Sequence, residues 1–234
     1  MKKRSIIAAL LIVFIGLTFA FSLCVDALSD REVFALNNHL KVVVDAGHGG
    51  IDGGVTGRSI GVKESDINLK IALQLCEKLE KTGLQPVLTR KTKEGLYDTT
   101  AKGFKRRDMQ KRKEIIEREN PALVLSIHQN FYPSAAQRGA QVFYLEGDKR
   151  DEELAVHLQN RLNELYAKEG VKARKNKAAD YFILASAASC PAALVECGFL
   201  SNLKDEALLC SEEFLEKLTT EIYLGVVAFL FASA

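Results

Sequence analysis

Short apolar runs alternate with longer amphipathic segments along most of this chain, and that alternation restricts the folds it can adopt. Apolar runs with strand character stand at residues 40–45, 85–90, 121–130, 139–147 and 191–202. Between them we expect helices over 65–82 and 150–170, a basic helix that ends near residue 120, and a terminal helix from about Ser211. Strands that alternate with helices of this length predict one α/β domain, in which a mostly parallel twisted sheet is flanked by helices on both faces.

The first 25 residues differ in composition from the rest of the chain. Three basic residues at 2–4 precede an uncharged apolar stretch at 6–23. This fits a secretory signal peptide, and it also approaches the length of a membrane-spanning anchor. We therefore expect a signal peptide or membrane anchor at 1–25, a linker at 26–39 and one catalytic domain at 40–234. In either case the domain is exported and acts outside the cytoplasm, in the cell wall or anchored to the membrane.

Charge and cysteine content exclude several classes of function. The 32 basic and 30 acidic residues leave a net charge of +2, so nucleic acid is not an expected partner. The five cysteines contain no C-x-x-C pair, and we expect free thiols without an essential disulfide. The basic stretch KGFKRRDMQKRK at 102–113 is interpreted as a solvated helix face.

A glycine-rich loop lies in VVVDAGHGGIDGG at residues 42–54, directly after the first apolar run. Such loops can bring backbone N–H groups close to a phosphate. However, the dinucleotide-binding pattern requires glycine where Asp52 stands, and the P-loop pattern requires a following lysine. Asp45 and Asp52 would also repel an anion. The glycines therefore favour a sharp turn that presents His48.

Three polar residues stand at or near the ends of predicted strands. His48 follows the first strand, His128 ends the run ALVLSI, and Glu196 follows AALV. Because loops converge at the carboxyl edge of a parallel sheet, we expect these side chains to meet there. Glu64, at the start of the next helix, returns to the same edge. Two imidazoles and one carboxylate, with an open fourth position, are a common ligand set of zinc hydrolases.

These positions predict a division of roles. His48, Glu64 and His128 are the candidate ligands of one Zn²⁺ ion, and Glu196, between apolar segments, is the candidate catalytic carboxylate and general base. Asp45 is expected to orient a ligand histidine, and Asn130 to steady a substrate oxygen or, preferably, to cap its loop.

The remaining histidines, His39 in the linker and His157 on an amphipathic helix, are assigned to structure.

The motifs VVVDAGHGGIDGG, KESDINLKIALQL, VLTR, LVLSIHQN and ALVECGFLSN, in this order, resemble those of the zinc-dependent N-acetylmuramoyl-L-alanine amidases of type 3. The resemblance covers nearly everything from about Lys41 to the C-terminus. It implies an α/β fold, the same three zinc ligands and catalytic Glu196. The implied substrate is peptidoglycan, cut at the amide between the lactyl group of N-acetylmuramic acid and L-alanine of the stem peptide.

Two positions depart from the family pattern, which often has proline at Ala46 and asparagine at Glu117. Arg112 matches an arginine usual on that helix, and we expect its role to be structural. The single-domain, membrane-directed layout is most similar to the spore-cortex amidases that form muramic-δ-lactam, and an activating protein partner is one expectation.

Two other functions stay open at this stage. A thiol hydrolase would use Cys197 or Cys190 with a histidine. A glycan-binding protein of the same fold would bind zinc without turnover, or would depend on a partner for activation.

Overall fold

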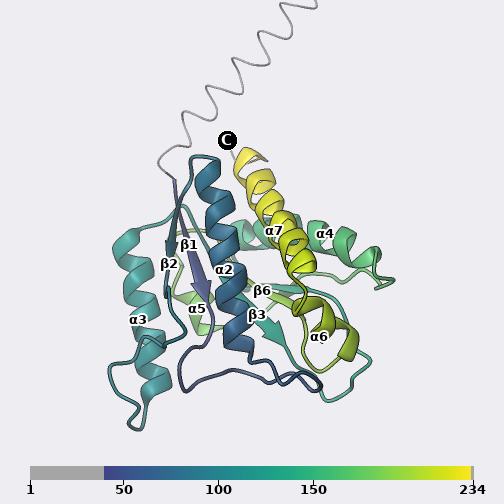
Figure 1. The fold of residues 1–234 in the computed structure, drawn as a ribbon. Helices are drawn as coiled ribbons and strands as arrows, with labels where there is room; N and C mark the ends of the chain where they lie inside the picture. Colours follow the sequence, from purple (N-terminus) through teal and green to yellow (C-terminus); the bar gives the residue numbers. More distant parts are fainter. Residues whose placement is uncertain (1–39, 233–234) are drawn as a thin grey trace, which may run out of the picture. The chain divides into compact units, whose positions relative to one another are not determined.

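The computed structural model describes residues 40–232. The expected signal or anchor, the linker with His39, and Cys24, one of the five cysteines, lie outside these residues. Five strands and six helices build most of the domain (Figure 1): β1 (Lys41–Ala46), α2 (Glu64–Lys81), β2 (Gln85–Leu88), α3 (Phe104–Glu119), β3 (Leu123–Asn130), β4 (Gln141–Tyr144), α4 (Lys149–Ala167), α5 (Phe182–Ala185), β6 (Ala192–Phe199), α6 (Leu203–Leu209) and α7 (Glu212–Ala232). A two-residue strand, β5 (Lys177–Ala178), completes the sheet.

The sheet has the strand order β2-β1-β3-β6-β4-β5. The pairs β2–β1, β1–β3, β3–β6 and β4–β5 are parallel, and β4 runs antiparallel to β6. The mostly parallel sheet predicted from the alternating pattern is therefore confirmed. Strand β4 runs in the opposite direction because only ten residues, 131–140, connect it to β3. This connection is shorter than a crossover to a parallel strand requires.

Helices cover both faces of this sheet, as predicted. On one face, α2, α4 and α7 pack with alternate strand residues such as Val44, Leu125 and Val195 into the larger core. On the other, α3 and α5 enclose a smaller core around Val43, Val124 and Leu194. Successive strand side chains point to opposite faces of the sheet. Residues two positions apart in a strand therefore join the same core. By this alternation, the side of the sheet that carries α3 and α5 also carries the side chains of Asp45, Ser126, His128 and Glu196.

Three short elements add to the expected pattern. The segment DYFILAS forms the one-turn helix α5, and the unanticipated α6 and β5 have seven and two residues. Elements this short carry too few periods of apolar residues to be recognised in a sequence. Asn202 is the N-cap residue of α6, and its side-chain oxygen accepts from the backbone N–H groups of Lys204 and Asp205 at 2.9 and 3.2 Å.

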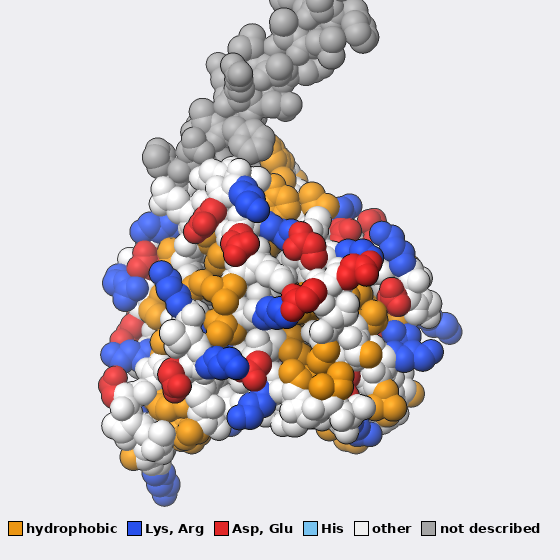
Figure 2. Space-filling model, viewed as in Figure 1, with side chains coloured by type: hydrophobic (Ala, Val, Ile, Leu, Met, Phe, Trp, Pro, Cys, Tyr) orange, Lys and Arg blue, Asp and Glu red, His pale blue; other side chains and the backbone are white. Residues whose placement is uncertain are grey.

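The surface carries charges of both signs. Figure 2 shows basic and acidic side chains interspersed over the face formed by α2 and α7, where Lys70 pairs with Glu212 and Lys78 with Glu216. The four cysteines among the described residues are free thiols. In residues 40–232, no helix combines the length and the apolar character needed to span a bilayer.

Candidate metal centre

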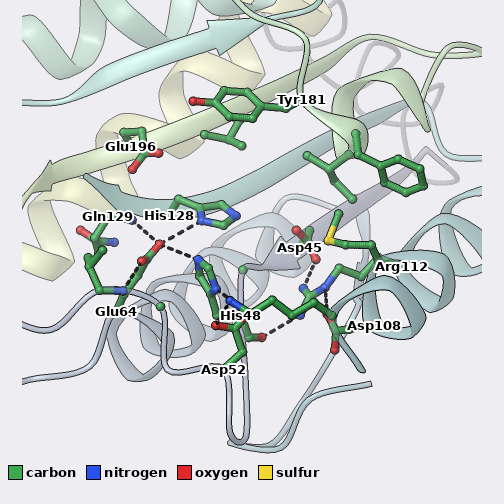
Figure 3. A pocket seen from close by; sticks show the side chains of 18 of the residues that line it. Asp45, His48, Asp52, Glu64, Asp108, Arg112, His128, Gln129, Tyr181 and Glu196 are labelled. Atoms are coloured by element: carbon green, nitrogen blue, oxygen red, sulfur yellow. Dashed lines mark hydrogen bonds and ion pairs between the residues drawn. The ribbon is translucent and has the colours of Figure 1, made fainter. Parts of the chain in front are cut away.

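The three predicted ligands come together at the carboxyl edge of the sheet. His48 lies in the loop after β1, Glu64 is the first residue of α2, and His128 lies near the end of β3. His48 Nε2 is 3.3 Å and His128 Nδ1 is 2.9 Å from the same oxygen, Glu64 Oε1. Figure 3 shows both imidazoles turned toward this carboxylate.

This donor set fits a small divalent metal ion. One ligand atom from each of the three residues lies within 4.8 Å of the other two. Two ligand atoms at about 2.1 Å from one tetrahedral zinc ion lie roughly 3.4 Å apart, which is close to the separations observed here. Two imidazole nitrogens and one carboxylate oxygen are also ligand types that catalytic zinc uses. The site is a possible metal centre by both distance and chemistry.

Glu64 is ionised and fixed in position. Burial opposes its ionisation, but hydrogen bonds and charge interactions with His128 and His48 outweigh burial and lower the pKa of Glu64 well below its usual value. Its Oε1 also accepts from Gln129 N at 3.1 Å, and its Oε2 accepts from Val55 N at 2.9 Å. The carboxylate therefore keeps its orientation through contacts from two separate segments.

Two glycines of the loop make room for ligand side chains. A Cβ at Gly47 would overlap the imidazole of His128, and one at Gly54 would overlap the carboxyl group of Glu64. Gly54 also has φ of 68°, in the left-handed region that favours glycine. His48 itself has φ of 63°, which is uncommon for a residue with a side chain and typical of strained functional sites. The glycine-rich loop thus both turns the chain and provides the space that the ligands occupy.

Glu196 lies beside the ligands in the same cavity. Strand β6 pairs with β3 so that Glu196 is the Cα partner of His128. The cavity has a volume of about 740 Å³ and contains the three ligand residues and Glu196 in its lining. Its apolar wall comes from α3, α5 and β6 and their flanking residues: Met109, Tyr181, Phe182, Ile183 and Leu194.

The environment of Glu196 suits proton transfer. Its Oε2 is buried and has no hydrogen-bond partner. Burial, with the nearby Glu64 charge adding to it, raises the pKa of Glu196 to about 7 against the opposing influence of the histidines. A carboxyl group with a pKa near neutrality can take up and release a proton at physiological pH.

Asp45, near the end of β1, lies in a buried polar cluster. Its carboxylate accepts from Thr89 Oγ1 at 2.7 Å and Ser126 Oγ at 2.6 Å, and it pairs with the Arg112 guanidinium. Burial opposes the ionisation of Asp45, but these contacts outweigh it and lower its pKa. Arg112 also donates to the carbonyls of Ala46 and His48 at 2.8 and 2.7 Å. Asp45 thus supports the loop through Arg112, and the expectation that Arg112 is structural agrees with its contacts.

Three residues make supporting contacts near the ligands that were not predicted from the sequence. Asp52 Oδ2 lies 3.1 Å from His48 Nδ1. Arg90, in the motif VLTR, donates to the carbonyls of Ala46 and Gly47 at 2.9 and 3.1 Å. Asn68 Nδ2 donates to Gly47 O at 3.1 Å. The three residues lie inside the motifs VVVDAGHGGIDGG, VLTR and KESDINLKIALQL, and this position was the signal that the sequence offered.

The other predicted positions are placed as follows. Asn130 ends β3, lines the cavity and accepts a backbone hydrogen bond from Leu200 N at 2.9 Å. Ala46 ends β1, and Glu117 lies on the exposed side of α3, paired with Lys113.

The candidate thiol nucleophiles are unsuited to catalysis. Both Cys190 and Cys197 are buried. Burial raises the pKa of Cys190 to about 11 and that of Cys197 further. Because the thiolate is the nucleophile, this geometry argues against the thiol hydrolase alternative.

Comparisons with known proteins agree with the site. Residues 42–228 match the family Amidase_3, N-acetylmuramoyl-L-alanine amidase. The germination-specific N-acetylmuramoyl-L-alanine amidase of Bacillus subtilis is 30% identical over 233 residues, which cover 98% of this chain and 96% of that protein.

Solved structures give the same result. The CwlD amidase from Clostridioides difficile, in complex with the GerS lipoprotein, has a TM-score of 0.78 and 35% identity, covering 82% of this chain and 99% of that one. The catalytic domain of CwlV from Bacillus (Paenibacillus) polymyxa has a TM-score of 0.71 and 27% identity, covering 82% of this chain and 98% of that one. The chain therefore belongs to the N-acetylmuramoyl-L-alanine amidase family, Amidase_3, and is a peptidoglycan hydrolase of the cell wall.

Proposed function

We propose that this chain cuts the amide between N-acetylmuramic acid and L-alanine with one Zn²⁺ ion held by His48, Glu64 and His128, and with Glu196 as the catalytic carboxylate. The observation that carries the proposal is the convergence of the three ligand residues within one cavity beside Glu196. When bound, zinc supplies a Lewis acid that polarises the scissile carbonyl and makes water a better nucleophile at neutral pH.

Glu196 moves the proton in this scheme. Its carboxylate takes the proton of the attacking water and later gives it to the departing L-alanine nitrogen, so no covalent enzyme intermediate is needed. Its unpartnered buried oxygen and its pKa of about 7 support both steps. Gln129 N and Val55 N hold the Glu64 carboxylate in place while the substrate binds. Asn130 lies on the cavity wall, where its side chain can cap the loop or steady a substrate oxygen.

We further propose that the catalytic domain at 40–234 works outside the cytoplasm, on spore-cortex peptidoglycan. The germination-specific relative and CwlD support this compartment. The apolar segment at 6–23, as a signal or an anchor, provides the route of export. Because the CwlD structure holds a lipoprotein, we also propose that a protein partner assists this chain.

The test is digestion of defined muropeptides by the purified full chain. Wild-type protein is incubated with and without chelator and with added zinc, and released stem peptide is measured by mass spectrometry. Zinc-dependent release that is absent in Glu196→Gln supports the proposal. Release that ignores the chelator contradicts the zinc assignment. In a parallel digestion, cortex peptidoglycan that yields no free stem peptide while vegetative wall does would contradict the cortex substrate.

The same experiment tests the glycan-binding alternative. A folded protein that binds zinc and muropeptide, but releases no stem peptide even with a cell extract that supplies partners, would be a binding protein. We favour the hydrolase because Glu196 lies in the cavity beside the ligands.

A further inference from the structure

The two ring nitrogens of His48 face different carboxylates. Nε2 lies 3.3 Å from Glu64 Oε1, on the side where the three ligand residues meet. Nδ1 lies 3.1 Å from Asp52 Oδ2, on the opposite side of the ring. Figure 3 shows His48 between Glu64 and Asp52. The imidazole is thus held from both ends.

The position of Asp52 is itself fixed. Lys105 Nζ, from the first turn of α3, lies 3.0 Å from Asp52 Oδ1. The backbones of Asp52 and Gly49 form two hydrogen bonds with each other, with nitrogen-to-oxygen distances of 2.8 and 3.1 Å. Between them, Ile51 N donates to the Tyr97 hydroxyl at 2.6 Å. Both the side chain and the backbone of Asp52 are therefore held by contacts, some of which come from outside the loop.

This arrangement determines which nitrogen can bind metal. A neutral imidazole carries its proton on one nitrogen and a free lone pair on the other. A carboxylate beside Nδ1 accepts the Nδ1–H proton, which leaves the Nε2 lone pair directed at the ligand site. Metal-binding histidines commonly use such a carboxylate, and its loss typically weakens metal binding by about 10- to 100-fold.

We infer that Asp52, held by Lys105, is a positioning residue that fixes His48 as the tautomer protonated at Nδ1, with Nε2 as the metal ligand. Asp45 was expected to orient a ligand histidine, but the carboxylate that lies beside Nδ1 of His48 is that of Asp52. The inference deepens the proposed function and rests on its metal site. It adds that the first turn of α3 contributes to metal affinity without contacting the metal.

The experiment measures zinc affinity of the full chain by competition with a chromophoric chelator, with zinc ion alone as the probe. Asp52→Ala removes the acceptor, and we expect the Kd for zinc to rise about 10- to 100-fold. Asp52→Asn keeps an oxygen that can accept Nδ1–H, so the rise should be smaller. Lys105→Gln should also raise the Kd, but less than Asp52→Ala. Asp66→Asn is the matched control, because Asp66 is an acidic residue on α2 whose side chain is 39% exposed, and its Kd should stay within about twofold of wild type.

A second readout separates positioning from general instability. Two-dimensional ¹H–¹⁵N NMR of the histidine rings in the zinc-loaded wild type should show His48 protonated at Nδ1. Urea unfolding of each metal-free variant establishes that it is folded.

The inference is overturned if folded Asp52→Ala or, should that variant not fold, Asp52→Asn binds zinc as tightly as wild type. It is equally overturned if His48 is protonated at Nε2. A wild-type chain that binds no zinc would instead overturn the metal site, and this inference with it.

Discussion

Loss of the Arg112 guanidinium should strongly destabilise the folded domain. The side chain is 1% exposed and pairs with two carboxylates, Asp45 and Asp108. It also donates to the carbonyls of Ala46 and His48 at the start of the glycine-rich loop. In Arg112→Leu, Asp45 would keep only its two hydroxyl donors, Thr89 and Ser126. Removing one partner of a buried ion pair typically costs about 3 to 5 kcal/mol, and we expect about 4 kcal/mol here.

Urea unfolding of the metal-free chain, followed by circular dichroism, measures this loss. With a typical slope of about 2 kcal/mol per molar urea, 4 kcal/mol lowers the midpoint by roughly 2 M. Asp45→Asn should cost less, about 3 kcal/mol, because Arg112 keeps Asp108. The double variant should lose less unfolding free energy than the sum of the two single variants, since both changes remove the same Arg112–Asp45 ion pair. Arg118→Leu, an exposed change on the same helix, is the control and should stay within about 0.5 kcal/mol of wild type.

The pH dependence gives an independent check. The pKa of Asp45 is lower in the folded state than in the unfolded chain. Its stabilising contribution is therefore fully present above the unfolded pKa of about 3.9 and is lost as the pH falls through the folded pKa. The stability difference between wild type and Asp45→Asn should narrow below pH 4 or so. A loss under about 1 kcal/mol for Arg112→Leu, or strictly additive single losses, would refute this reasoning.

Three further predictions concern the site and the sheet. Glu196→Gln should lower kcat for muropeptide cleavage by about 10²- to 10⁴-fold while zinc affinity stays near wild type; an active variant would contradict its role. Gly54→Ala should abolish zinc binding, because the added Cβ overlaps the Glu64 carboxyl group. The control Gly170→Ala, whose added Cβ meets open space, should bind zinc as wild type does. Equal zinc binding by the two variants would contradict a steric effect of the Gly54 Cβ on Glu64. Burial raises the folded-state pKa of Asp151 to about 6, so its contribution to stability is full below the unfolded pKa of about 3.9 and is lost as the pH rises through 6 or so. The difference in free energy of unfolding between wild type and Asp151→Asn should therefore fall by about 2 to 3 kcal/mol from pH 4 to 7.5. A difference that does not change with pH would contradict the raised pKa of Asp151.

Much of the fold follows from the sequence because each long element carries its own periodic signal. The apolar runs that became β1, β3 and β6 and the amphipathic spacing of α2 and α4 are local patterns. Strand order and the antiparallel direction of β4 are not local, because they depend on which strands pair across the whole domain. The lengths of α5, α6 and β5 fall below what periodicity can detect.

The candidate site was likewise predictable from the sequence only in part. His48, Glu64 and His128 could be predicted to converge, because strand ends and the following helix start meet at one sheet edge. The partner of His48 could not be predicted so easily. Asp45 and Asp52 lie at similar distances from His48 along the chain, and the tight turn at 49–52 decides which carboxylate reaches Nδ1. Because side chains alternate between the two faces of the sheet, the Asp45 side chain lies on the α3 side, where it accepts a hydrogen bond from Ser126, its neighbour across β1 and β3.

Stoichiometric zinc titration of the chelator-treated chain tests the central claim most directly. Muropeptide cleavage is measured as zinc is added to wild type and to the ligand variant His48→Ala. The account predicts no activity without metal, a linear rise that saturates at one zinc per chain, and no recovery in His48→Ala at the same zinc concentrations. Activity that survives complete removal of the metal, or recovery in His48→Ala equal to wild type, would contradict it.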